Sequence, residues 1–129
     1  MNTAMVIDDS RAMRAILARM LRALGFDVVE AANGQEALDR LQTLRELPVI
    51  ALVDWNMPVM NGLDFVTKVR AREEWRNIAL MMVTTESEYS QIVRALAAGA
   101  HEYVIKPFTA DALRDKLALL GLLPQEVSL

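Results

Sequence analysis

The sequence predicts an α/β protein with a doubly wound parallel sheet and helices on both faces. Short apolar runs with the character of buried strands alternate with longer segments whose apolar residues recur every three or four positions. The first, third and fourth runs are apolar throughout, which is typical of strands covered by helices on both faces. Right-handed crossovers between such units produce a single doubly wound sheet of five strands.

The strands are expected where apolar residues form runs of three to five. The second strand, from Asp27 to Glu30, contains few apolar residues and therefore suits an edge of the sheet. A strand order of 2-1-3-4-5 would place the ends of the first and third strands side by side at the switch point of the topology. The expected strands are residues 4–7, 27–30, 49–53, 80–83 and 103–105.

The helices are indicated by apolar spacing and by residues suited to their ends. Gly25 is suited to end the first helix. Asn33, three residues before Glu36, predicts the start of the second helix, and Thr109 can cap the last. The apolar helix faces comprise Met13, Ile16, Leu17, Met20, Leu21 and Leu24; Ala37, Leu38, Leu41 and Leu44; Leu63, Val66 and Val69; Ile92, Val93 and Leu96; and Leu113, Leu117 and Leu120.

Length and composition indicate one compact domain. A chain of 129 residues fits a single domain over 1–129, with 124–129 expected to be a loose tail. The absence of cysteine excludes disulfides and thiolate metal sites. A net charge of -3 and a pI near 5.1 argue against direct binding of nucleic acid. Because no membrane-spanning stretch or signal-peptide pattern is present, we expect a cytoplasmic protein with no membrane association.

Charged and hydroxyl side chains stand at the ends of four predicted strands. Asp8 and Asp9 follow the first strand, Asp54 follows the third, Thr84 follows the fourth and Lys106 follows the fifth. Parallel strands bring their carboxyl ends to one edge of the sheet, so these groups should converge. Two carboxylates about 4 Å apart repel by roughly 4 kcal/mol even at an effective dielectric of about 20, so the cluster needs a proton or a cation. Oxygen ligands alone favour Mg²⁺, with Mn²⁺ as a substitute.

Such a site could handle a phosphoryl group. A metal that the protein only partly coordinates leaves positions for phosphoryl oxygens, and Lys106 is the candidate ammonium that neutralises the remaining charge. Asp54, on the central strand, could attack phosphorus to form an acyl phosphate. Thr84 could then donate its hydroxyl to a phosphoryl oxygen and draw its loop inward.

Four segments together resemble the receiver domain of two-component response regulators, and most closely the stand-alone regulators of chemotaxis. The resemblance extends over essentially the whole chain and implies a flavodoxin-like fold. That family is itself a standard example of the 2-1-3-4-5 order, so the expected order is partly borrowed from it. The segments are Val6 to Met13, Val53 to Gly62, Val83 to Glu86 and Tyr103 to Phe108.

The resemblance implies a switch in a phosphorelay. A sensor histidine kinase would transfer a phosphoryl group to Asp54 in a Mg²⁺-dependent reaction. The protein would not be an enzyme in the usual sense, since it would catalyse only its own phosphorylation and dephosphorylation. Asp9 and Asp54 would bind the metal directly, Asp8 largely through water, and Asn56 through its backbone carbonyl. Lys106 and Thr84 would bind the phosphoryl group.

The resemblance also implies an output. The ring of Tyr103 would turn inward as Thr84 moves. Asn56 and Glu86 would set the hydrolysis rate of the acyl phosphate, and their identities predict a short-lived signal. A target protein would dock on the fourth helix, fifth strand and fifth helix, near Tyr103 and Lys116. A monomer or a weak dimer is expected.

Other interpretations stay open. Asp8 and Asp9 could simply cap the first helix and complement its dipole. The chain could be a receiver fragment of a larger transcriptional regulator. An aspartyl-phosphate phosphohydrolase is less favoured because such enzymes typically need a second acid two residues after the nucleophile, where Asn56 stands. A nucleotide-binding enzyme is disfavoured because no glycine-rich loop follows the first strand. His101 is expected to be a surface turn residue.

Overall fold

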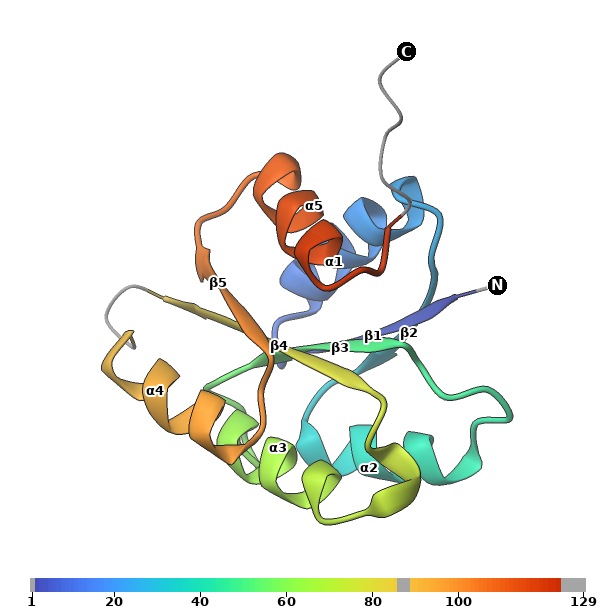
Figure 1. The fold of residues 1–129 in the computed structure, drawn as a ribbon, viewed down its shortest axis with the longest axis vertical. Helices are drawn as coiled ribbons and strands as arrows, with labels where there is room; N and C mark the ends of the chain where they lie inside the picture. Colours follow the sequence, from blue (N-terminus) through green and yellow to red (C-terminus); the bar gives the residue numbers. More distant parts are fainter. Residues whose placement is uncertain (1, 86–88, 124–129) are drawn as a thin grey trace.

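Residues 2–85 and 89–123, which the computed structural model describes, form a five-stranded parallel sheet between two layers of helices (Figure 1). The strand order is β2-β1-β3-β4-β5, as predicted. The strands are β1 (Thr3–Ile7), β2 (Asp27–Ala31), β3 (Ile50–Asp54), β4 (Ala79–Thr85) and β5 (Glu102–Lys106).

The helices divide between the two faces of the sheet, as a doubly wound topology requires. Helices α1 and α5 cover one face, and α2, α3 and α4 cover the other (Figure 1). A short 3-10 helix, η1, leads into β4. The helices are α1 (Arg11–Ala23), α2 (Gly34–Thr43), α3 (Gly62–Arg70), η1 (Glu73–Trp75), α4 (Tyr89–Ala98) and α5 (Ala110–Leu119).

Side-chain caps fix where the helices begin. Asn33 and Thr109 begin α2 and α5 as predicted, because the oxygen of each side chain accepts a hydrogen bond from the N–H three residues further on, at 2.9 and 3.0 Å. Helix α1 is capped by Ser10, which accepts from the third N–H along at 3.2 Å. Ser10, and neither Asp8 nor Asp9, is therefore the capping residue of this helix, although the side chain of Asp8 accepts the N–H of Ser10 just ahead of it at 2.8 Å.

Apolar side chains on alternate strand positions form a core on each face of the sheet. Val6, Leu52 and Val104 belong to the cluster beneath α1 and α5, which we call the α1/α5-side core. Met5 and Phe65 belong to the cluster on the opposite face. Full burial of a large apolar side chain contributes roughly 1.5–3 kcal/mol, so these two cores hold the layers together. The strand ends between them are thereby held in a fixed relation.

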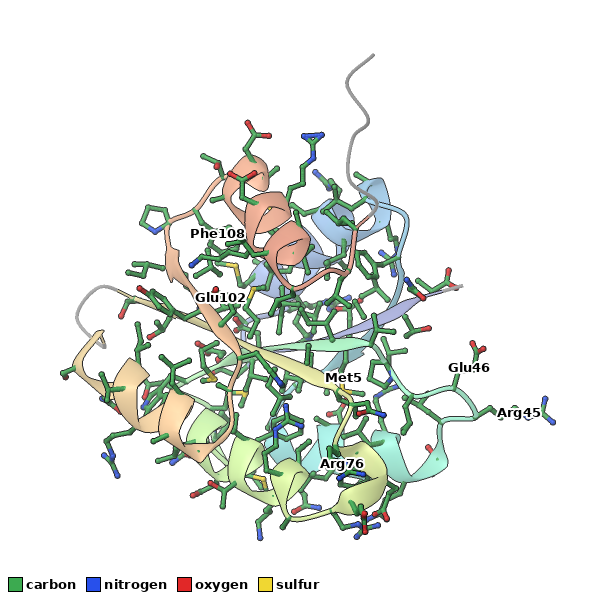
Figure 2. All side chains as sticks on the ribbon, in the orientation of Figure 1. Met5, Arg45, Glu46, Arg76, Glu102 and Phe108 are labelled. Carbon is green, nitrogen blue, oxygen red and sulfur yellow. The ribbon has the colours of Figure 1, made fainter. Side chains whose placement is uncertain are left out.

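The strand β2 lies at an edge of the sheet, as its polar sequence predicted. Its first four residues remain partly or fully exposed. In Figure 2, Met5 lies inside the molecule, whereas Arg45 and Glu46 project outward from the connection between α2 and β3. Nowhere in residues 2–85 and 89–123 does a helix combine the length and the apolar character that crossing a membrane requires.

Arg70, the last residue of α3, connects the segments that lead into β4 and β5. Its guanidinium donates to the carbonyl oxygens of Gly99 at 2.9 Å, Arg76 at 3.1 Å and Ile78 at 2.7 Å. These carbonyls lie after α4 and around η1, where the backbone has run out of helical partners. A planar fork with five donors can satisfy several acceptors at once, which an ammonium cannot. Arg70 therefore fastens α3 to the end of α4, 29 residues further along the chain.

His101 has a more specific place than the surface turn that the sequence predicted. Although the residue is exposed, its Nδ1 accepts a hydrogen bond from the N–H of Leu80 at 3.2 Å and lies 3.1 Å from Nη2 of Arg70. A nitrogen that accepts from two donors carries no proton, so the neutral ring bears its proton on Nε2. Burial of the inner ring edge and the nearby Arg70 lower the pKa of His101.

We expect Arg70→Met to lower the free energy of unfolding by about 2–4 kcal/mol, because three backbone carbonyls, two of them in part-buried hydrogen bonds, would lose their donor. Urea denaturation followed by circular dichroism measures this loss. The control is Lys68→Met, which removes an exposed cation from the same helix and should change the free energy by less than about 0.5 kcal/mol. Equal losses in the two variants would contradict the role given to Arg70.

Candidate functional site

Three charged residues at strand ends point to the same face of the sheet: Asp54 and Lys106 are the last residues of β3 and β5, and Asp8 directly follows β1. Asp8, Asp54 and Lys106 each come two positions after a strand residue of the α1/α5-side core. Because side chains alternate along a strand, all three point toward the face that α1 and α5 cover. The ammonium Nζ of Lys106 lies 3.2 Å from Oδ1 of Asp54 and 3.4 Å from Oδ2 of Asp8. The structure thus joins the ends of β1, β3 and β5 by one cation.

The three aspartates form an acidic cluster. Carboxylate oxygens of Asp8, Asp9 and Asp54 all lie within 4.8 Å of one another. Asp8 is 1% exposed and Asp54 is 8% exposed, whereas Asp9 faces solvent. One ammonium cannot neutralise three carboxylates, and a donor set of oxygens alone suits a hard divalent cation that keeps several waters. The cluster fits a magnesium-type ion.

Asp8 is held at every polar atom it has. Its N–H donates to the carbonyl of Ala31 at 3.1 Å, and its carbonyl accepts from Nη1 of Arg14 at 2.6 Å. Its Oδ1 accepts from the N–H of Ser10 at 2.8 Å, and its Oδ2 contacts Lys106. These partners come from β2, α1, the loop before α1 and β5. These contacts fix the position of Asp8 in the site.

The charges in this pocket shift one another's protonation. The pKa of Asp54 is raised to about 6. Burial is the largest cause and the nearby carboxylate of Asp8 adds to the rise, while Lys106 opposes it. Burial by itself would lower the pKa of Lys106, but Asp54 and Asp8 outweigh that effect and raise it. At neutral pH Asp54 is thus ionised at a cost to the folded state. A bound cation would relieve that cost.

The loop after Asp54 is tightly shaped. The N–H of Gly62 donates to the carbonyl of Trp55 at 2.9 Å, and a Cβ at position 62 would lie 2.5 Å from the backbone oxygen of Asp54. Asn61 caps α3 through a hydrogen bond of 2.9 Å. Val59 has a φ of 70°, a left-handed conformation that a β-branched residue rarely adopts. Only glycine at 62 lets α3 begin this close to the Asp54 backbone.

Thr84 and Tyr103 share the other face of the sheet. Asp54 pairs in register with Val83, so Thr84 is the next residue beyond it on β4. Tyr103 pairs with Met82, and alternation places Thr84 on the same side as Met82. Thr84 is 1% exposed. The hydroxyl and the aromatic ring thus lie at the end of the sheet that carries the acidic cluster, but on the face opposite the lysine.

Tyr103 is half-buried beside a charged pair on β5 and α5. The ammonium of Lys116 lies 2.9 Å from a carboxylate oxygen of Glu102 and 4.7 Å from the centroid of the Tyr103 ring. Figure 2 shows Glu102 on β5. Lys116, which the sequence placed near the docking face, is therefore already engaged inside its own chain.

Of the two positions expected to set the hydrolysis rate, the structure describes only Asn56. Asn56 lies in an exposed bend two residues after Asp54. Glu86 lies outside the described residues.

Arg14 is the site residue that the sequence analysis missed. Its side chain reaches back from the first turn of α1 to the Asp8 carbonyl, a contact that depends on how α1 packs on β1. The strand-end pattern carried no sign of it, because Arg14 stands inside a helix. Its place four residues after the cap Ser10 is the one local signal that it faces the site.

Fold and site together define a class of protein. An acidic cluster and a lysine meet at the switch point of a doubly wound sheet, with a buried threonine on the next strand. This arrangement can accept a phosphoryl group on a carboxylate and respond to it at the strand ends, so the class is that of phosphorylation switches.

Comparison with known proteins makes the assignment specific. The family model described as response regulator receiver domain matches residues 4–118. Chemotaxis protein CheY1 of Helicobacter pylori strain J99 is 44% identical over 117 residues, covering 90% of this chain and 94% of that protein. A CheY homolog of Campylobacter jejuni is 45% identical over 114 residues, covering 88% and 87%. The chain belongs to the response regulator receiver domain family, whose members are signalling proteins of two-component systems.

A solved structure supports the same assignment. The chemotaxis protein CheY4 of Vibrio cholerae has a TM-score of 0.84 and 33% sequence identity, covering 92% of this chain and 98% of that one. The flavodoxin-like fold that the family resemblance implied is thereby confirmed.

We expect Asp54→Asn to raise the free energy of unfolding by roughly 1–3 kcal/mol at pH 7 in EDTA. The pKa of Asp54 is raised from 3.8 to about 6 on folding, so the folded state binds its proton more tightly. The cost of ionisation is absent below about pH 4, grows between about 4 and 6, and is constant above. Urea denaturation of both proteins from pH 4 to 8 measures the difference. A gap that is constant with pH would contradict this origin.

We expect Gly62→Ala to destabilise the protein by about 2 kcal/mol or more, because the new Cβ would meet the Asp54 backbone at 2.5 Å. Gly34→Ala is the matched control, since Gly34 also opens a helix but its Cβ would meet only the flexible side chain of Met60, at 2.9 Å. Thermal denaturation compares the two. A larger loss in Gly34→Ala would show that the loop at Gly62 can yield.

Proposed function

We propose that this chain is a stand-alone response regulator that accepts a phosphoryl group from a sensor histidine kinase on Asp54. The observation that carries the proposal is the Lys106 ammonium, which lies between Asp8 and Asp54 at 3.4 and 3.2 Å. It marks the place where the negative charge of an incoming phosphoryl group would be neutralised. The near full-length similarity to CheY proteins supports a role in chemotaxis, with residues 1–129 acting as one cytoplasmic receiver domain.

The chemistry is a transfer between two side chains. An Asp54 carboxylate oxygen attacks phosphorus while the bond from phosphorus to the kinase's histidine nitrogen breaks, and the imidazole leaves with the electron pair. Lys106 can then exchange its contact with Asp54 for one with a phosphoryl oxygen. Between signals the same residues promote attack by water. The protein thus acts only on its own phosphoryl group.

We assign Mg²⁺, with Mn²⁺ as a substitute, to the acidic cluster. Asp9, Asp54 and the backbone carbonyl of Asn56 would be the protein ligands, and Asp8 would act through water. The difference between the two neighbouring acids supports this division, because Asp9 is exposed while both carboxylate oxygens of Asp8 already have partners. When bound, the ion supplies positive charge for the phosphoryl oxygens.

The switch would run through Thr84 and Tyr103, which lie on one face of the sheet. A hydrogen bond from Thr84 to a charged phosphoryl oxygen is worth roughly 1.5–3 kcal/mol, which moves a two-state equilibrium about tenfold to a hundredfold. Tyr103, now half-buried beside Lys116, would turn inward as Thr84 moves. Asn56 and Glu86 would keep the acyl phosphate short-lived.

The output surface would be formed by α4, β5 and α5. Apolar side chains are exposed on both helices, with Val93 at 68%, Leu96 at 40% and Leu119 at 76%. A protein target that buries these side chains would sense the rearrangement at Tyr103. We propose a monomer or weak dimer that binds protein targets and neither nucleic acid nor membrane.

We expect acetyl phosphate with Mg²⁺ to phosphorylate the native protein and to change the fluorescence of Trp55, which is buried directly after Asp54. Mass spectrometry should show the added phosphoryl group, and both signals should vanish in Asp54→Asn and in EDTA. Trp75, buried in η1 just ahead of β4, adds a constant background that a Trp75→Phe variant removes. Labelling that persists in Asp54→Asn would overturn the assignment of the acceptor.

A further inference from the structure

Arg14 joins the acidic cluster to the body of the fold. Its Nη1 donates to the backbone carbonyl of Asp8 at 2.6 Å, while its Nε lies 3.5 Å from a carboxylate oxygen of Glu30 on β2. The Arg14 side chain is only 17% exposed, although it begins on the first turn of a surface helix. The guanidinium therefore bridges α1, the end of β1 and the edge strand.

The carbonyl that Arg14 holds belongs to the peptide that joins Asp8 to Asp9. A peptide unit is planar, so fixing its oxygen also fixes the direction of the Asp9 N–H and limits where the Asp9 side chain can point. Asp8 has further anchors at its own N–H and at both carboxylate oxygens. Asp9 is exposed, yet its carboxylate lies within 4.8 Å of those of Asp8 and Asp54, so its direction depends on the backbone that carries it.

The positive charge of Arg14 is paired with the carboxylate of Glu30, which reduces its effect on the three aspartates. Glu30 takes up the other edge of the guanidinium, and the pair is partly open to solvent, with Glu30 40% exposed. A nearby cation by itself would repel a divalent metal from the three carboxylates. An electrostatic role and a geometric role for Arg14 therefore predict opposite signs for its removal.

We propose that Arg14 is a positioning residue that orients Asp9 toward the divalent cation through the Asp8–Asp9 peptide. The proposal rests on the function proposed above. Groups that orient metal ligands without touching the metal typically contribute 10–100-fold to metal affinity. Arg14 acts through a backbone carbonyl, so its contribution is expected at the lower end of that range, about tenfold.

The test measures binding of Mg²⁺ alone by isothermal titration calorimetry. Arg14→Met keeps the length of the side chain but removes its donors, and its affinity for Mg²⁺ should fall about tenfold. Arg14→Lys keeps the charge but has a single donor nitrogen in place of the two that Arg14 uses, and its affinity for Mg²⁺ should fall less, about threefold. The control is Arg11→Met, which removes an exposed cation from the same turn and should bind as tightly as the native protein or slightly more tightly.

Phosphorylation by acetyl phosphate gives a second measurement that a general loss of structure would not imitate. In Arg14→Met the Mg²⁺ concentration for half-maximal rate should rise about tenfold, while the rate at saturating Mg²⁺ should stay within about twofold of native. If Arg14→Met does not fold, the threefold loss of Mg²⁺ affinity in Arg14→Lys becomes the test of the positioning role, because that variant retains the charge.

The outcomes separate the alternatives. Equal or tighter Mg²⁺ binding in Arg14→Met, or native affinity in Arg14→Lys when Arg14→Met is unfolded, overturns the positioning role while leaving the proposed function intact. A fall in the saturated rate without a change in Mg²⁺ affinity also overturns it. Failure of the native protein to bind Mg²⁺ would instead overturn the proposed function, and this inference with it.

Discussion

The interaction on which the rest of the molecule depends is the placement of one ammonium between two buried carboxylates. Asp8 and Asp54 sit at the ends of adjacent central strands, and without Lys106 their repulsion would act in a poorly hydrated pocket. The strand order brings β1 and β3 together, and the parity of each strand turns all three side chains to one face. The fold thus assembles a site whose crowded carboxylates cost the folded state stability, and a bound cation would offset that cost.

Much of this could be predicted from local sequence. Strands and helices could be inferred from apolar spacing, the caps Asn33 and Thr109 from their residue types, and the convergence at the site from the charged residues directly after each strand. The contacts of Arg14, Arg70 and His101 could not, because each joins segments whose proximity exists only after the layers have packed. The separation of Thr84 and Lys106 onto opposite faces could not be predicted either, because both strands are apolar on both faces and only the register of the sheet distinguishes them. The predictions for Glu86 and for the tail 124–129 concern residues outside the described structure.

The two ends of the sheet are built differently. Where β4 and β5 begin, Arg70 and His101 saturate backbone groups with neutral or charge-assisted hydrogen bonds. At the opposite end, carboxylates are crowded and the loop after Asp54 contains a strained valine. Hydrogen bonds thus satisfy the backbone where β4 and β5 begin, whereas like charges and an unfavourable backbone conformation are concentrated at the end that carries the site.

The edge strands of the sheet affect a different property, the tendency of two copies of the chain to associate through their sheets. An edge strand offers unpaired backbone groups to any other strand, and proteins guard against this with charged residues. Here the edge strand β2 carries the exposed Asp27 and the partly exposed Glu30. Pairing of two β2 edges would bring acidic side chains together. Like charges on an edge strand therefore disfavour edge-to-edge pairing between copies of this chain.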